Sequence, residues 1–147
     1  MTTRSKKIGK VASLAAAEEQ RLGQAAGQAQ QQLNVHLDRL GELNAFRHNY
    51  AKKSAGKTTL RASHWQDYQA FLHRLDTAVR AQQQIVRDSE RMLETHRQRW
   101  IAKRQRVESL ERVLEKYRSE ERLREARREQ KRLDELPKNP PPFRDEE

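Results

Sequence analysis

The fold is decided by the stretch Trp65–Tyr117, which reads WQDYQAFLHRLDTAVRAQQQIVRDSERMLETHRQRWIAKRQRVESLERVLEKY. Apolar side chains recur in it at seven-residue spacing. If Trp65 takes heptad position a, all eight a positions as far as Leu114 are apolar. At this chain's apolar content that regularity has a chance of roughly 1 in 5,000, so the pattern predicts one long helix with a seam along one face.

The second seam position, d, is less regular. Four of its residues are apolar and the four between them are polar: Tyr68, Leu75, Gln82, Ser89, His96, Lys103, Leu110 and Tyr117. A seam with polar gaps predicts a partner helix whose side chains are matched to it.

The composition favours a long helical protein over a globular one. The chain has 147 residues, of which 34% are hydrophobic and 35% charged, which is too little apolar material for a globular core of this length. Cysteine is absent, so no disulfide or thiolate metal site is expected. No apolar run approaches membrane-spanning length and no signal peptide opens the chain, which predicts a cytosolic location.

Glycine and proline punctuate the chain at few places. They predict a single elongated domain with a first helix over about 8–53, a hinge over about 54–62, a second helix over about 63–136 and a proline-rich tail over 137–147. Met1 to about Lys7 is expected to be frayed. Ser63 is a candidate N-cap of the second helix, and Pro137 ends it.

The two helices fit together if the chain folds back near residue 57. Trp65 then faces Tyr50, Leu93 faces Leu22 and Val107 faces Ile8, while Gln82 faces Leu33 and His96 faces Glu19. The prediction is an all-α fold, a long antiparallel two-helix coiled-coil hairpin. At about 1.5 Å per residue the rod would be roughly 110 Å long.

The second helix is expected to overhang the first. Its overhang begins beyond Leu114, the predicted partner of Met1. Oppositely charged pairs support a single solvated helix there, and three are expected: Glu120–Arg124, Glu125–Arg128 and Glu129–Arg132.

The chain has a net charge of +10, and the excess of basic residues sits on the first 107 residues, which predicts attraction to acidic partners, anionic lipid or nucleic acid. A basic region joined to heptads suggests a basic coiled-coil nucleic-acid-binding protein as one alternative. However, the arginines between Arg74 and Arg106 overlap the seam segment instead of preceding it, and the leucine-at-d, asparagine-at-a pattern of such zippers is missing. No nucleic acid is therefore expected as a partner.

Catalytic chemistry is not expected. No glycine-rich phosphate loop or nucleophile motif is present, and the five histidines lie at spacings that bring no two together at i+3 or i+4. The sequence predicts a protein that is not an enzyme and needs no metal or cofactor.

Aromatic residues gather around the hinge. Five of the eight in the chain lie there: Phe46, Tyr50, Trp65, Tyr68 and Phe71. One interpretation is that they cap the open end of the hairpin. The other is that they form an exposed patch that anchors a partner protein. Truncation of Phe71 separates the two.

Residues on and off the seam resemble the FliJ family of flagellar export proteins. The resemblance rests on the run Trp65–Gln83, on the run Arg128–Glu135, on Trp100, on Glu111–Tyr117 and on the Phe46-x-x-x-Tyr50 pair. Identities off the seam, such as Gln69, Phe71 and Gln130, do not follow from heptad spacing. The tail 137–147 lies outside the resemblance.

The resemblance implies a non-enzymatic component of the flagellar type III export apparatus, needed for flagellum assembly and hence motility and chemotaxis. Its implied partners are the ring of the export ATPase FliI, the membrane export gate FlhA and possible export chaperones, at the cytoplasmic face of the inner membrane. The implied gate-facing residues at the hinge end are Leu43, Phe46, Tyr50, Phe71, Leu75, Ala78 and Gln82. The implied ring-facing residues are Arg122, Arg124, Arg128, Gln130, Lys131 and Leu133. The equivalent stalk protein of a virulence-type secretion system is the other alternative.

Overall fold

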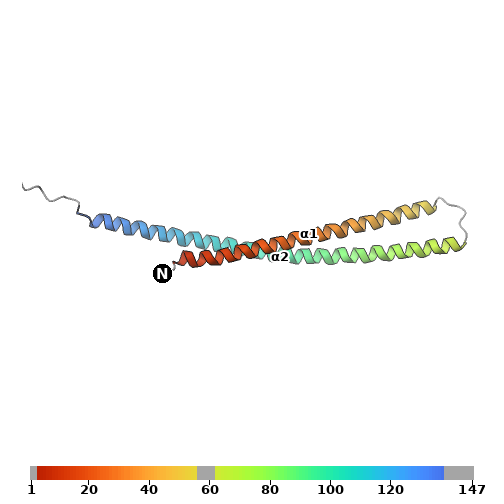
Figure 1. Ribbon diagram of the computed structural model, residues 1–147, viewed down its shortest axis with the longest axis horizontal. Helices are drawn as coiled ribbons and strands as arrows, with labels where there is room; N and C mark the ends of the chain where they lie inside the picture. Colours follow the sequence, from red (N-terminus) through yellow and green to blue (C-terminus); the bar gives the residue numbers. More distant parts are fainter. Residues whose placement is uncertain (1–2, 56–61, 138–147) are drawn as a thin grey trace, which may run out of the picture. The chain divides into compact units, whose positions relative to one another are not determined.

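Two long helices make up the fold in the computed structural model, which describes residues 3–55 and 62–137. Helix α1 spans Arg4–Ala55 and helix α2 spans Ala62–Glu135, and no strand occurs in these two ranges (Figure 1). The prediction of an all-α helical hairpin is confirmed. The predicted turn near residue 57 and the tail beyond residue 137 lie outside the described residues.

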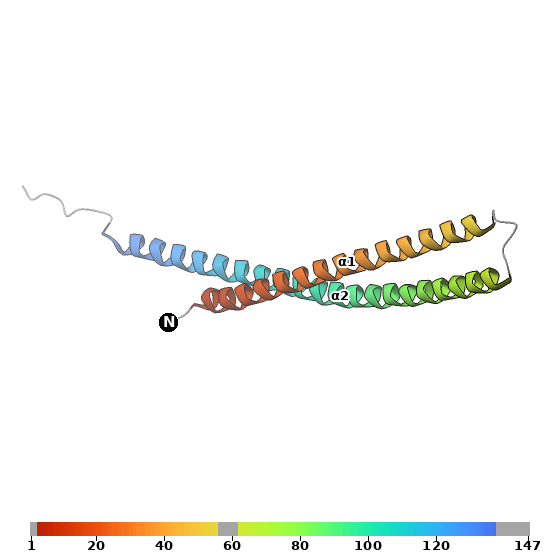
Figure 2. The ribbon, with the colours of Figure 1, turned by 45° about the vertical axis from the view of Figure 1, so that its right-hand side comes forward.

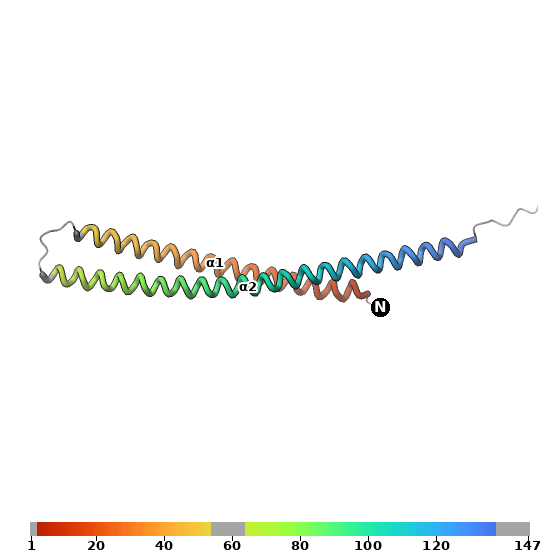
Figure 3. Tube along the Cα trace, turned by 180° about the vertical axis from the view of Figure 1, so that it is seen from behind, coloured from red at the N-terminus to blue at the C-terminus, as the bar shows by residue number. Residues whose placement is uncertain are grey.

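The chain divides into two compact units. We call Glu18–Lys103 the hairpin unit, and Met1–Ala17 with Arg104–Glu147 the terminal unit. Within each unit a length of α1 lies side by side with a length of α2 and runs in the opposite direction, as the views in Figures 1, 2 and 3 agree. Each unit buries its own set of small and branched apolar side chains.

The seam of the hairpin unit uses the predicted heptad positions. Ala29 and Leu33 of α1 form one buried cluster with Val86 and Leu93 of α2, and Leu40 packs against it. The polar d residues Gln82 and Ser89 are also buried. Alanine on the α1 side lets the two backbones approach closely, so a seam with few large side chains still excludes water.

The pairing register differs from the predicted one by three or four residues. Tyr50 stacks on Tyr68 with ring centroids 5.2 Å apart, where Trp65 was predicted. The buried amide of Gln82 donates a hydrogen bond to the carbonyl oxygen of His36 at 2.9 Å, where Leu33 was predicted. A buried amide needs a polar partner, so the observed register satisfies Gln82 where the predicted one would leave it against an apolar side chain.

Trp100 strengthens the same register. Its indole Nε1 donates a hydrogen bond to Glu19 Oε1 at 2.9 Å, so Glu19 faces Trp100 and not His96. The ring has room because Gly23 lies beneath it. A Cβ built on Gly23 would be only 3.0 Å from Trp100 Nε1. The absence of a side chain at residue 23 therefore lets a large aromatic occupy an otherwise thin seam.

The terminal unit has a smaller buried cluster. It consists of Ala12, Ala15, Val107 and Leu110. Val107 was predicted to face Ile8 and instead shares this cluster with the two alanines one step along the seam. The pairing register is therefore shifted in the same direction as in the hairpin unit: residues of α2 face residues of α1 that come later in the sequence than predicted.

The first turn of α1 is ordered, contrary to the prediction of a frayed lead through Lys7. Thr3 acts as the N-cap, because its Oγ1 accepts a hydrogen bond from the Lys6 N–H at 3.4 Å. Glu121 of α2 completes the cap across the seam: it accepts hydrogen bonds from the Ser5 hydroxyl at 2.6 Å and from the Ser5 N–H at 3.3 Å. Helix α1 has no acidic residue of its own in the first turn, so Glu121 supplies the negative charge that a helix N-terminus favours.

Because of this contact, the overhang begins later in the sequence than predicted. The sequence predicts it after Leu114, but α1 still contacts α2 at Glu121. From Leu123 to Glu135 every side chain of α2 is exposed, and Arg122 before them has 66% of its side chain exposed. We call this length, residues 122–135, the overhang.

Candidate partner-binding surfaces

Neither a metal-binding cluster nor a membrane-spanning helix is found in the described part of the chain. Within residues 3–55 and 62–137, no three histidine, cysteine, aspartate or glutamate side chains come close enough to hold a metal ion. The helices drawn in Figure 1 are too polar for any of their described lengths to cross a membrane. What the surface does offer is two sets of side chains suited to protein contact.

The first set is an aromatic cluster at the hinge end of the hairpin unit. Tyr50 is its centre: its ring lies 4.6 Å from Phe71 and 5.2 Å from Tyr68, measured between centroids. Phe46 meets Phe71 edge-on at 6.2 Å, and Trp65 lies 5.7 Å from Tyr68. All five aromatic residues singled out from the sequence therefore form one continuous group contributed by both helices.

The cluster is covered on one side only. Tyr50, Tyr68 and Phe71 are half-buried between the helices, whereas Phe46 keeps 52% of its surface exposed and Trp65 keeps 50%. The inner rings hold the two helices together, and the outer rings present apolar surface to solvent. The half-buried rings thus fit the interpretation as a cap, and the exposed rings fit the interpretation as a docking patch.

The predicted gate-facing residues lie at three depths. Phe46 is exposed, and Leu43, Tyr50, Phe71 and Ala78 are half-buried. Leu75 and Gln82 are buried in the seam, beneath the exposed side chains. An ion pair between Arg47 and Asp76, 2.7 Å long, borders this region and ties the two helices together beside the rings.

The second set is the overhang of the terminal unit. It carries all six predicted ring-facing residues on its solvated surface: Arg122, Arg124, Arg128, Gln130, Lys131 and Leu133. The structure adds Leu123, which is 53% exposed and was not singled out from the sequence. Leu123, Ala126, Gln130 and Leu133 follow the three–four spacing of a helix face, which is the sequence signal that would have identified Leu123.

Few ion pairs tie down the charges of the overhang. Of the three expected within it and just before it, Glu129–Arg132 forms, at 3.8 Å. Glu120–Arg124 and Glu125–Arg128 do not come within ion-pair distance in the described part of α2. Arg122 instead reaches Glu115 at 2.9 Å. Exposed pairs of this kind stabilise a helix only slightly. Arg124, Arg127 and Arg128 of the overhang make no ion pair or side-chain hydrogen bond among the described residues.

Two of the carboxylates that join α1 to α2 have lowered pKa values because of that contact. The hydroxyl of Ser5 donates to Glu121 and lowers the pKa of that carboxyl below its ordinary value of 4.5, and the Ser5 N–H adds to the effect. The ammonium of Lys103 bonds to Glu18 and attracts its charge, which lowers the pKa of Glu18 in the same way. Both contacts favour the ionised carboxylate and join the helices near neutral pH.

A coiled-coil hairpin with an aromatic patch and a cationic single helix defines a class of protein that works by binding other proteins. The sequence matches the family described as Flagellar FliJ protein over residues 5–138, and the chain belongs to this family. No curated protein and no solved structure matches it. The family is a non-enzymatic part of flagellar protein export, so the chain is a component of the flagellar export apparatus.

Proposed function

We propose that this protein bridges the ring of the export ATPase FliI and the export gate FlhA, and that it assists the export of flagellar substrates at the cytoplasmic face of the inner membrane. The observation that carries the proposal is that its two candidate contact surfaces belong to different compact units. The aromatic cluster belongs to the hairpin unit and the overhang to the terminal unit, so each is free to bind a different partner.

The overhang is the proposed ring-facing surface. It offers Arg122, Arg124, Arg128 and Lys131 beside Leu123 and Leu133, all of them in contact with solvent. A helix without a folded partner on any side fits a central opening, where subunits surround it. The basic and apolar mixture suits acidic and hydrophobic walls, and arginine is common at such contacts.

The aromatic cluster is the proposed gate-facing surface. Large rings that are exposed on one side and held by other rings on the other side lose little freedom on binding, which is typical of hot spots. Phe46 and Trp65 are the outermost, with Phe71 half-buried between them and the seam. Export chaperones, the third implied partner, would compete with the gate for the same aromatic side chains.

A pull-down with the cognate export ATPase tests the ring-facing end. The protein is compared with a version that ends at Glu121, which keeps the bond between Ser5 and Glu121 and removes the overhang. We expect loss of ATPase binding with retention of gate binding. Equal capture of the ATPase by both versions would show that the ring contacts another surface.

Phe71→Ala tests the gate-facing end. We expect gate binding to fall at least about tenfold while ATPase binding is unchanged. Thermal unfolding is measured on the same variant, because a fall in stability with unchanged binding would assign Phe71 to the cap alone. Leu123→Ala is the matched control, since it removes exposed apolar surface from the other unit.

A further inference from the structure

An apolar stripe runs along α2 beyond the aromatic cluster. Phe71, Ala78, Ile85 and Met92 follow one another at seven-residue spacing, so they share one face of the helix beside the seam. The first two are half-buried, but Ile85 is 42% exposed and Met92 57% exposed. No described segment of the chain covers the exposed pair, and exposed apolar side chains in such a row need an explanation.

Two arginines bracket this stripe. Arg74 lies between Phe71 and Ala78 on the same face, and Arg99 takes the next position in the seven-residue series after Met92. Neither makes an ion pair or a side-chain hydrogen bond among the described residues. They are about 37 Å apart along the helix at 1.5 Å per residue.

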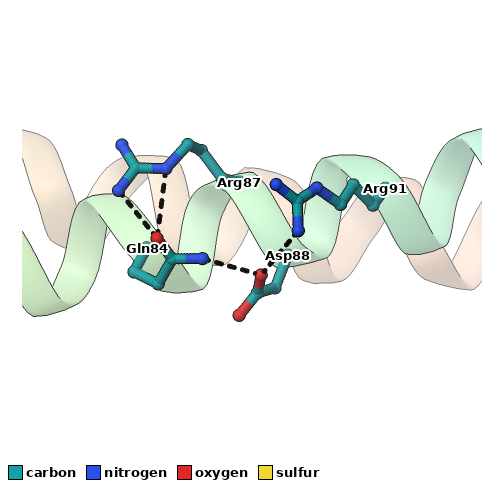
Figure 4. Close-up of polar contacts among 4 residues, drawn as sticks. All are labelled: Gln84, Arg87, Asp88 and Arg91. Atoms are coloured by element: carbon teal, nitrogen blue, oxygen red, sulfur yellow. Dashed lines mark hydrogen bonds and ion pairs between the residues drawn. The ribbon is translucent and has the colours of Figure 1, made fainter.

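The arginines on the adjoining face behave differently. Arg87 donates to Gln84 Oε1 at 2.8 Å, Gln84 donates to Asp88 Oδ1 at 2.9 Å, and Arg91 lies 3.8 Å from the same Asp88 oxygen (Figure 4). Their donors are engaged within α2 itself. Arg74 and Arg99 therefore lie at the two ends of the apolar stripe without such a partner, as do Arg80 and Arg106 elsewhere on the described part of α2.

We propose that the stripe binds an acidic amphipathic helix of a partner protein, whose apolar residues pack on Ile85 and Met92 and whose carboxylates pair with Arg74 and Arg99. The inference deepens the proposed function, since Phe71 and Ala78 also belong to the gate-facing surface. Seven-residue spacing suits a helix, which presents apolar side chains at the same repeat. The unpaired arginines supply the complementary charge.

A second copy of this chain fits less well. Two identical stripes that run in opposite directions would place Arg74 against Arg99, and stripes in the same direction would place each arginine against itself. Both arrangements bring like charges together. An anionic lipid surface also fits less well, because the apolar row is one residue wide and a lipid surface gives no advantage to a seven-residue repeat.

The test uses the full chain and two designed peptides of about four heptads, labelled for fluorescence anisotropy. Both carry leucine at two positions per heptad, and the remaining surface is rich in glutamate in one and in lysine in the other. We expect the glutamate peptide to bind, more tightly at low than at high salt, and the lysine peptide not to bind.

Two variants and two controls locate the site. Joint Ile85→Ser and Met92→Ser substitution should weaken binding at least about tenfold, since these side chains are the apolar anchors. Joint Arg74→Gln and Arg99→Gln substitution should weaken binding and reduce its salt dependence. Arg80→Gln, an equal loss of charge off the stripe, and Val35→Ser, an equal loss of exposed apolar surface on α1, should bind as the unmodified protein does.

Each other outcome overturns the inference. These outcomes are equal binding of the two peptides, binding of neither, or full binding by the Ile85 and Met92 variant. Dimerisation that the variant abolishes, measured by sedimentation, would assign the stripe to a second copy. Loss of binding to phosphatidylglycerol vesicles in that variant would assign it to lipid. None of these results touches the ATPase pull-down, so the proposed function can stand or fail separately.

Discussion

Helix α2 contains a covered length and an uncovered one, built from similar residues. Before Glu121 its apolar seam side chains lie against α1, and Leu93 is only 4% exposed. In the overhang, Leu123 and Leu133 occupy equally helical backbone but remain more than half exposed. The difference lies in whether a second helix is present, since no glycine or proline separates the two lengths. Tertiary contact supplies stability in the first, and the second is the length that we propose for contact with another protein.

The largest expected effect comes from truncation of a leucine in each length. Leu93→Ala should lower the free energy of unfolding by about 2–4 kcal/mol, because it opens a cavity among Ala29, Leu33 and Val86. Leu123→Ala should change it by less than about 0.5 kcal/mol. Urea unfolding followed by circular dichroism measures both. Similar losses would mean that the overhang is packed against something in solution.

The seam could be predicted from sequence because burial follows spacing. Val86 and Leu93 at a, with polar Gln82 and Ser89 at d, fall on the face that the heptads predict, and they are buried. The register could not be predicted, because a step of three or four residues keeps every seam residue on the seam. It depends on contacts that spacing does not encode, such as the bond from Gln82 to the backbone of α1 and the fit of a tryptophan above a glycine.

The two candidate binding surfaces, the aromatic cluster and the overhang, could be predicted from the sequence only in part. Ring size and position near the turn identified the aromatic cluster, because five large apolar side chains exceed what two helices can cover. The heptads place Leu75 and Gln82 in the seam, where both are buried, whereas the family resemblance implies that they face the export gate. Whether those residues take part in binding stays a prediction. Leu123 lies within the implied ring-facing length but was not named there, because its stripe is apart from the seam that the heptads define.

Two glycines of α1 differ in the same way as the two lengths of α2: Gly23 lies against Trp100, and Gly27 has open space beside it. A methyl group added at Gly27 would enter open space, with no neighbouring side chain of the described residues within 4 Å. Gly27→Ala should therefore stabilise the protein by about 0.5–1 kcal/mol through helix propensity. At Gly23 the new methyl group would press on Trp100, at 3.0 Å, and disturb its bond to Glu19, so Gly23→Ala should be less stable than the unmodified protein. Thermal unfolding of the two variants side by side checks the opposite signs.

Glu121 is the last carboxylate of α2 that contacts α1, whereas Glu125, one turn further on, is exposed. Because the Ser5 hydroxyl stabilises ionised Glu121, its pKa is lower in the folded than in the unfolded chain. Its contribution to stability is therefore full above its ordinary value of 4.5 and is lost as the pH falls through the lower folded pKa. Carboxyl titration by NMR should show the pKa of Glu121 below its ordinary value of 4.5, and the Ser5→Ala substitution should raise it again. A Glu121 pKa unaffected by that substitution would mean that the cap across the seam does not form.

The smallest effect is expected where both partners are uncovered. Glu129 and Arg132 form an exposed i,i+3 pair at 3.8 Å, so Glu129→Gln should cost only a few tenths of a kcal/mol of local helix stability. Global unfolding should not change, because the overhang is not part of either buried cluster. Amide hydrogen exchange in residues 122–135 should accelerate slightly, and more at low salt than at high salt. A change in global stability equal to that of a seam substitution would show that the overhang folds together with the hairpin, and the contrast between the two lengths of α2 would then be one of exposure alone.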